Sequence, residues 1–500
     1  MNTDTAHFTL ELTARGNWKS PLYPEQTPDF DLVLRNTGSS TVSALPLYGS
    51  FETPRIVLSR ASGATIGIYT KADMYRRQVG DPERQRPEPP EFVEMAPGKG
   101  SQISVSAWDY HSALPPGSYA IAAEHRTAPG GAFIRSNRFG FEVVAASVKS
   151  MAIGYDSAGR LASVLAWLAA EVSAANASER LLVRISSAKG HSSLMMGATS
   201  HGEYPAGSLV SVGQGMAGTR QSPRNWLAVL SGGQVTAIRH TMSIPSWRSE
   251  PVALPISGGV PVPRFPSMND QMLFLATGAG SKGAVLAGAM FQQPTGLLQQ
   301  WTVPVNEKPS LTACLARLKR PASLLLAANG QGGSRISRLD VSFEGKLMGS
   351  EKLLRQSKNT VMAVAPAFDP ASGDAFFVLE CSAEEPDRLA LVTIPMSGPA
   401  RADKPKPTPG WPRDDNGKAV KAVQTQIEQA VDGTIALALV DARGFFYGGK
   451  LRPKAFVGQL RDKADSPCSF PQIGALSRNA TPACFTSEGM LFAPGAESEE

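Results

Sequence analysis

Two acids and three histidines are the side chains of this sequence that could carry out chemistry. Glu428 and Asp369 fall on segments rich in small residues, where a carboxylate could serve as a general acid or base. His191, His201 and His240 are near one another along the chain and could gather near one face. Imidazoles bind zinc, but the paired-histidine spacing of zinc motifs is missing. We therefore expect surface or loop histidines and not metal ligands.

A short acidic stretch has the composition of a calcium loop. Asp414, Asp415 and Asn416 precede Gly417, but the alternating acid spacing and the distal glutamate of that motif are missing. The sequence also contains no glycine-rich phosphate loop, no dinucleotide-binding motif and no nucleophile elbow. We expect no metal and no cofactor, and we predict that the protein is not an enzyme.

A proline-rich segment is the first candidate for partner binding. Residues 81–91 include Arg84, Arg86, Pro89 and Pro90, and the prolines impose an extended, polyproline-like loop. The pattern favours either a partner-binding arm or a solvated insertion. We name these four residues as tentative partner-binding residues.

A second proline-rich segment spans residues 399–418 and places Trp411 among four prolines. We expect it to project from the edge of a sheet. It is either a solvated insertion or a docking loop with Trp411 as its anchor, because tryptophan is enriched at binding hot spots. Trp411 is therefore the fifth tentative partner-binding residue.

Composition limits the class of protein. Of 500 residues, 42% are hydrophobic and 18% are charged, so the chain can fold around a core. No apolar run is long enough for a membrane-spanning helix, and no secretory signal precedes the first strand, so we expect a cytoplasmic protein. Four widely spaced cysteines indicate reduced, structural thiols. The net charge of +6 comes without interleaved aromatic residues, so nucleic-acid binding is a weak alternative.

The first 150 residues alternate apolar and polar side chains as strands do. Phe8, Leu10 and Leu12 share one face, and Phe30 begins a similar strand that ends in an Asn-Thr-Gly turn. Several more strands follow with no helical periodicity, so each has one apolar face to bury, which favours a β-sandwich. The Asn-Thr-Gly turn and a late Pro-Gly-Ser-Tyr strand resemble immunoglobulin-like modules found beside larger bacterial domains. Such modules usually serve in spacing or adhesion.

The remaining residues repeat one apolar hexapeptide, with successive copies starting 45 to 59 residues apart. The copies are residues 181–186, 226–231, 272–277, 323–328, 375–380, 434–439 and 482–487. Upstream of most copies lies a strand of small residues, for example 311–316 and 361–366. A period of 40 to 50 residues, all strand and turn, is typical of four-stranded propeller blades, with the small residues innermost.

The array resembles seven-bladed β-propellers in general. It lacks the Gly-His and Trp-Asp dipeptides of WD40 repeats, the double glycine of kelch repeats and the Asp box of sialidases. We predict that residues 151–155 pair as the outer strand of the C-terminal blade and so close the ring, which removes exposed sheet edges.

The predicted fold is therefore all-β, with an immunoglobulin-like β-sandwich in residues 1–147, a seven-bladed propeller in 148–496 and an acidic tail in 497–500. The predicted function is a non-enzymatic scaffold or adaptor for a protein partner, within a larger bacterial regulatory or defence assembly. The alternative is a propeller hydrolase, lyase or glycan binder acting at the axial mouth. Convergent acids and histidines around the axis would favour that alternative.

Overall fold

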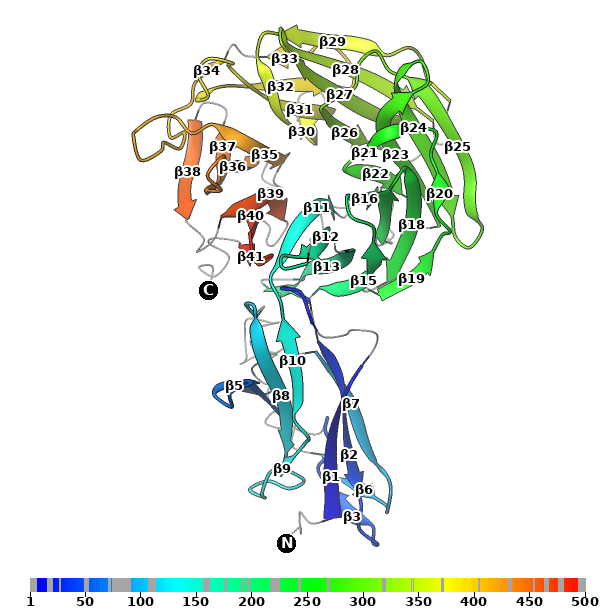
Figure 1. Cartoon of the computed structure of the whole chain (residues 1–500), viewed down its shortest axis with the longest axis vertical. Helices are drawn as coiled ribbons and strands as arrows, with labels where there is room; N and C mark the ends of the chain where they lie inside the picture. Colours follow the sequence, from blue (N-terminus) through cyan, green and yellow to red (C-terminus); the bar gives the residue numbers. More distant parts are fainter. Residues whose placement is uncertain are drawn as a thin grey trace.

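The structure of the protein is a computed structural model. It describes residues 7–15, 21–26, 28–48, 54–70, 73, 91–106, 114–155, 162–174, 178–189, 192–195, 198–215, 225–241, 244–267, 270–316, 321–342, 344, 346–369, 373–402, 405–429, 434–452, 455–462, 467–474 and 481–492. All elements in these residues are β-strands. None of the described segments is a helix of the length and apolarity that crossing a membrane requires. Figure 1 shows a ring of sheets and, beside it, a smaller pair of sheets built from the N-terminal residues.

The N-terminal body consists of two sheets and a short ribbon. One sheet has the order β1-β2-β7, with strands Phe8–Ala14, Asp29–Asn36 and Gly100–Ser106. The other has the order β10-β8-β4-β5, with β9 beside β8; its strands are β4 Arg55–Arg60, β5 Thr65–Thr70, β8 Gly117–His125, β9 Ile134–Arg135 and β10 Phe139–Val143. The ribbon pairs β3 (Val42–Ala44) with β6 (Val93–Met95).

The two N-terminal sheets enclose one apolar core. The alternating residues Leu10, Leu12 and Phe30 of the first sheet are buried together with Leu58 and Phe141 of the second. Leu10 lies opposite Leu34 in the register of β1 and β2, so both strands turn the same face inward. The alternation in the sequence therefore predicts the buried face of these strands, because successive side chains of a strand point to opposite faces.

The ring begins with sheets formed by consecutive strands. The strands of the first sheet are β11 Ala146–Tyr155, β12 Ala162–Glu171, β13 Glu179–Lys189, β14 Ser192–Met195 and β15 Thr199–Tyr204. The next strands are β16 Leu209–Gly215, β17 Asn225–Ser231, β18 Gln234–Thr241, β19 Ile244–Arg248 and β20 Val252–Ala253. They are followed by β21 Ser257–Pro261, β22 Arg264–Ser267, β23 Gln271–Gly280, β24 Gly283–Gln292 and β25 Gly296–Pro304. Parallel pairing of β16 with β22 joins these last two groups into one sheet.

The ring continues in the same way toward the C-terminus. A four-stranded sheet contains β26 Leu311–Leu315, β27 Ala322–Gly330, β28 Gly333–Val341 and β29 Lys352–Ser357. The following sheet contains β30 Thr360–Asp369, β31 Gly373–Cys381, β32 Arg388–Pro395, β33 Arg401–Ala402 and β34 Lys406–Pro407. The last two are β35 Ala422–Gln429, β36 Ile435–Asp441, β37 Phe446–Arg452 and β38 Ala455–Asp462, and then β39 Cys468–Gly474, β40 Thr481–Thr486 and β41 Leu491–Phe492.

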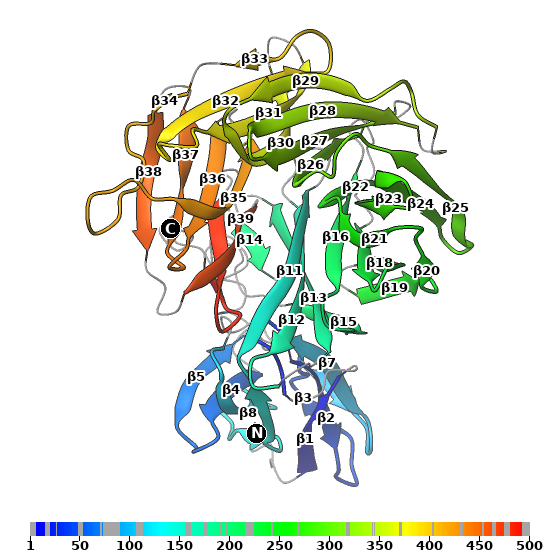
Figure 2. The ribbon, with the colours of Figure 1, turned by 45° about the horizontal axis from the view of Figure 1, so that its top comes forward.

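The arrangement of these sheets is propeller-like. The inner strands contact one another in the order β11, β16, β22, β26, β30, β35 and β39, and β39 in turn contacts β11. Figure 2 shows these strands around the middle of the ring, with the later strands of each sheet farther out. Some inner strands carry small side chains toward the neighbouring sheet, for example Ala363, Ala365 and Ala367 of β30, which belong to a buried cluster shared with β35 and β36.

The predicted pairing of residues 151–155 with the C-terminal blade is wrong. These residues belong to β11, which pairs with β12 so that Ile153 lies opposite Leu165. β11 is an inner strand of the first sheet and only lies beside β39. The small residues explain this place, since a Cβ on Gly154 would lie 2.9 Å from the carbonyl oxygen of Gly213 in β16.

Six of the seven hexapeptides begin on or beside the strand that directly follows an inner strand, namely β17, β23, β27, β31, β36 and β40. The copy assigned to residues 181–186 is the exception, because it lies in β13, the third strand of its sheet. The true counterpart is β12, where residues 164–170 are all buried. β13 resembles a second strand because Leu181, Leu182 and Val183 are also fully buried.

Candidate functional site

An ion pair crosses the middle of the ring. Glu428 of β35 accepts two hydrogen bonds from the guanidinium of Arg264 of β22, with Nη2–Oε2 at 2.7 Å and Nη1–Oε1 at 3.2 Å. Nε of Arg264 also donates to the backbone oxygen of Ile153 in β11, at 2.8 Å. β22 and β35 are not neighbours in the ring, so these contacts tie three inner strands together across the axis.

This pair decides what Glu428 can do chemically. Both of its carboxylate oxygens are engaged by one guanidinium, and the two side chains are only 14% and 10% exposed. A bidentate, charge-assisted pair of this kind holds the carboxylate in one orientation. Glu428 was predicted to lie on an inner strand and does, but its partner Arg264 was not foreseen. Asp369 ends β30, and its side chain lies outside the described residues.

Two of the predicted histidines meet in the structure. His201 of β15 and His240 of β18 are buried, with their rings edge to face and their centroids 5.8 Å apart. The expectation that they are surface or loop residues is wrong, because the apolar sheets close over both. Burial, with a smaller contribution from His201, lowers the pKa of His240 well below its usual range. His191 lies outside the described residues. Among the residues that are described, no cluster of three metal-binding side chains exists.

The contact between the N-terminal body and the ring is made by several hydrogen bonds. The chain between β1 and β2 reaches into the ring, and Glu25 is buried there. Its carboxylate accepts from Nη1 of Arg184 in β13 at 3.0 Å and from the backbone N–H of Leu491 in β41 at 3.1 Å. Its backbone oxygen accepts from Ala198 at 2.7 Å. One side chain thus joins the first sheet, the last sheet and the N-terminal body.

The chain conformation at Glu25 carries a cost. Its φ is 67°, in the left-handed region, which side chains other than glycine occupy at roughly 1–2 kcal/mol. Burial raises the pKa of Glu25, while the charge of Arg184 and the hydrogen bond from Leu491 lower it in part. The contacts on both neighbouring sheets offset this cost. Sequence reasoning missed Glu25, because nothing in an isolated acid between two strands marks it as buried.

Apolar packing surrounds this contact. Tyr23 lies in a core cluster with Trp167 of β12 and Phe485 of β40, whose ring centroids are 5.2 Å apart. The guanidinium of Arg180 lies 4.3 Å from the centre of the Tyr23 ring and donates to the backbone oxygen of Pro21. The N-terminal segment therefore covers the line where the first and last sheets of the ring meet. We call this region, made of residues 21–26 and the parts of β12, β13, β40 and β41 that they contact, the seam.

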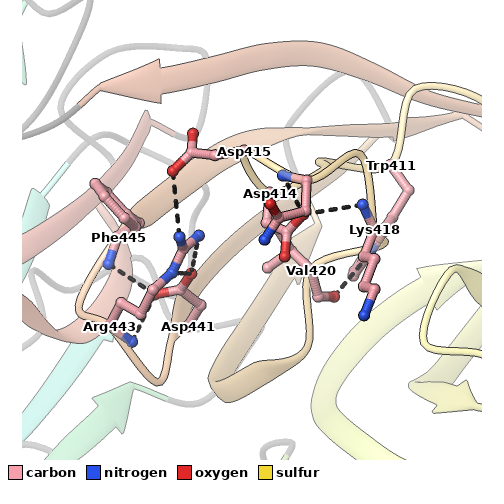
Figure 3. A network of polar contacts seen from close by, with 9 residues as sticks. Trp411, Asp414, Asp415, Lys418, Val420, Asp441, Arg443 and Phe445 are labelled. Carbon is pink, nitrogen blue, oxygen red and sulfur yellow. Dashed lines mark hydrogen bonds and ion pairs between the residues drawn. The ribbon is translucent and has the colours of Figure 1, made fainter.

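Trp411 is buried, at 3% exposure. Its indole N–H donates to the backbone oxygen of Val420 at 2.9 Å, and its ring packs with Leu389 and Tyr447 in a cluster of the two flanking sheets. Figure 3 shows it beside the turn that follows, where the carboxylate of Asp414 accepts from the backbone N–H of Lys418. A role of Trp411 in partner binding stays a prediction. Because the indole is buried, it would act by holding the loop in its conformation.

We expected residues 399–418 to project from the edge of a sheet. This expectation is wrong for residues 401–402 and 406–407, which form strands of the sheet. β33 and β34 pair with β32 and form the outer edge of their sheet. Both carboxylates of the acidic turn have partners within the protein. Asp414 accepts from the backbone N–H of Asn416, and Asp415 lies 3.4 Å from Arg443. That guanidinium also binds Asp441, as Figure 3 shows.

The other tentative partner-binding residues, Arg84, Arg86, Pro89 and Pro90, lie outside the described residues. In the sequence, the segment that holds them lies between β5 and β6. β5 is the last strand of its sheet, and Ile68 on it is 51% exposed. In the ring, β25 is likewise the last strand of its sheet within the described chain and contains no charged residue, and Leu298 on it is 41% exposed. Uncharged edge strands of this kind can accept a strand from a partner.

No protein-family model matches the sequence, and no curated protein matches it. Several solved structures are similar. BBS1N in complex with ARL6DN is 13% identical, with a TM-score of 0.32, covering 63% of this chain and 86% of that one. KlHsv2 with its loop 6CD replaced by a Gly-Ser linker is 12% identical, with a TM-score of 0.37, covering 69% and 90%. AofleA from Arthrobotrys oligospora is 10% identical, with a TM-score of 0.38, covering 65% and 92%.

Proposed function

We propose that this protein is a non-enzymatic scaffold that holds protein partners within a larger bacterial assembly. In this proposal the ring is a seven-bladed propeller, with one blade for each inner strand of the series that runs from β11 to β39. The N-terminal body is an immunoglobulin-like module that offers a second contact surface at a fixed distance from the ring.

The contact of Glu25 with Arg184 and Leu491 carries the proposal. A spacer on a flexible linker would leave the two bodies free to move, as small polar interfaces between domains usually do. Here a buried ion pair and an apolar cluster around Tyr23 fix one body on the other. A rigid pair of bodies suits a scaffold, because a partner that contacts both surfaces then binds without the entropy cost of ordering them.

The arrangement at the axis supports a scaffold over the alternative of an axial enzyme. A general acid or base must reach a substrate with a free carboxyl oxygen. Both oxygens of Glu428 are bound to Arg264, and the pair ties opposite sides of the ring together. Freeing Glu428 for catalysis would leave the largely buried charge of Arg264 without its counter-charge, at a cost of about 3–5 kcal/mol.

The test is affinity capture of the tagged full-length chain from its own host, with mass spectrometry of what is retained. The proposal expects a stoichiometric protein partner, whose binding weakens when Arg84, Arg86, Pro89 and Pro90 are all replaced by glycine or serine. A matched control replaces four exposed residues, the three of the turn 382–387 together with Ser397, and should bind normally. If the chain captures no protein but hydrolyses or binds glycans, the axial alternative is correct. If retention is lost steeply with salt and follows nucleic acid, the scaffold proposal is also wrong.

A further inference from the structure

Two of the four cysteines lie together in the last sheet of the ring. Cys468 is in β39 and Cys484 is in β40, and the structure holds both as free thiols. In the register of the two strands Cys468 lies opposite Thr486. Cys484 is two residues from Thr486 and so points to the same face of the sheet, diagonally across from Cys468.

The surroundings bring the two thiols into contact. Both side chains belong to one buried cluster with Ala438, Val440 and Phe446 of the neighbouring sheet. The interaction between the two thiols lowers the pKa of Cys468, although burial acts in the opposite direction, and together with burial it raises the pKa of Cys484. One thiol of the pair therefore forms a thiolate more easily, and the other acts as its hydrogen-bond donor. Cys468 also retains 5% of its surface exposed, whereas Cys484 has none, so Cys468 is the thiol that an oxidant meets first and Cys484 is placed to resolve the product.

The other two cysteines lie in separate sheets, and neither has a second thiol beside it. Cys314 lies in the β26–β29 sheet and Cys381 in the β30–β34 sheet, and each is buried without another thiol in its cluster. Burial raises the pKa of Cys314 to about 12 and that of Cys381 to about 11. They supply internal controls of the same residue type.

We propose that Cys468 and Cys484 form a dithiol site that small peroxides oxidise to an intramolecular disulfide. The Cys468 thiolate attacks one oxygen of hydrogen peroxide, the O–O bond breaks, and the product is a sulfenic acid and one water after proton transfer. The Cys484 thiol then displaces the sulfenic hydroxyl as a second water. Two electrons pass from the two sulfurs to the peroxide, and both thiol protons leave in water.

The site has a structural consequence at the seam. Phe485, the residue after Cys484, packs against Trp167 of the first sheet. A disulfide between β39 and β40 would tie the strand that carries Phe485 to the inner strand of its own sheet. The oxidised form should therefore unfold at a higher temperature than the reduced form, because the bond closes a loop of the unfolded chain.

The experiment treats the folded, full-length protein with hydrogen peroxide, quenches with acid and counts alkylated thiols after denaturation. We expect four alkylated thiols to become two, the intact mass to fall by two hydrogen atoms, and peptide mapping to link Cys468 to Cys484. The variant C314S/C381S should still form the disulfide. C484S should form no disulfide, and C484A provides a second variant if the serine prevents folding.

Three outcomes would overturn the proposal. The first is that all four thiols survive peroxide concentrations that already oxidise methionines of the same sample. The second is a disulfide that maps to a pair including Cys314 or Cys381. The third is that the Cys468–Cys484 bond forms only after denaturant is added, which would assign it to the unfolded chain. None of these readouts depends on a binding partner, so the scaffold proposal is tested separately.

Discussion

At the scale of single residues, buried charges hold neighbouring sheets together. Glu380 of β31 has no exposed surface, and its carboxylate accepts from Nε and Nη2 of Arg355 in β29 at 2.6 and 2.9 Å. Ser357 and Asn359 donate to the same carboxylate at 3.2 and 3.0 Å. Burial raises the pKa of Glu380, but these hydrogen bonds and the charge of Arg355 together lower it further, so its pKa is below the usual range.

The variant E380Q tests the contribution of this hydrogen-bonded ion pair to stability. The folded-state pKa lies below the unfolded value of about 4.3, so the stabilisation is present above that value and is lost as the pH falls through the folded pKa. E380Q should lower the free energy of unfolding by about 3 kcal/mol at pH 7 and flatten its acid dependence. Urea unfolding at several pH values measures both effects. E384Q, an exposed acid nearby, is the control. Equal acid dependence in wild type and E380Q would contradict the prediction.

Residue-level chemistry was predictable only in part. Glu428 could be placed on an inner strand because its segment lies directly upstream of the apolar hexapeptide 434–439. Its partner Arg264 is 164 positions away, and no local pattern joins the two. The same holds for Glu25 and Arg184, which are 159 positions apart. A ring of sheets brings distant strands to one axis, so its ion pairs are set by tertiary closure and not by spacing along the chain.

At the scale of elements, Trp411 fixes the connection between two sheets. We expect W411A to cost about 3–5 kcal/mol, since a buried indole leaves a large cavity. W411F should cost less, about 1–2 kcal/mol, because it keeps most of the packing but leaves the backbone oxygen of Val420 without its donor. Hydrogen exchange of residues 405–420 measures the effect, and protection of β12 serves as the internal control. Unchanged exchange in W411A would show that the indole does not hold the loop.

The repeat pattern shows how far elements could be inferred from sequence. The apolar hexapeptides identify second strands correctly wherever only that strand is buried on both faces, as in β36. The pattern fails in the first sheet, because the N-terminal segment covers β13 and buries it as well. The failed prediction for residues 151–155 has the same origin. A small-residue strand fits every inner position of the ring, so composition alone does not specify its partner.

At the scale of the whole molecule, the seam makes the two bodies one unit. The line between the first and last sheets is bridged by side chains, through Trp167 and Phe485. In the described residues the sheet that contains β41 has one strand fewer than the β35–β38 sheet before it. The N-terminal segment covers this line with Tyr23 and Glu25. The N-terminal body is therefore part of how the ring is held together.

The variant E25Q tests this coupling. Glutamine keeps an acceptor for the N–H of Leu491 but leaves the guanidinium of Arg184, which is 7% exposed, without its counter-charge. The cost should be about 3–5 kcal/mol, and much of it should return in E25Q/R184M, where no buried charge is left. In calorimetry we expect one cooperative transition for the wild type, two for E25Q, and a return toward one for the double variant. E11Q, an exposed acid on β1, should unfold as the wild type does. Two separate transitions already present in the wild type would mean that the bodies fold independently and that the seam does not couple them.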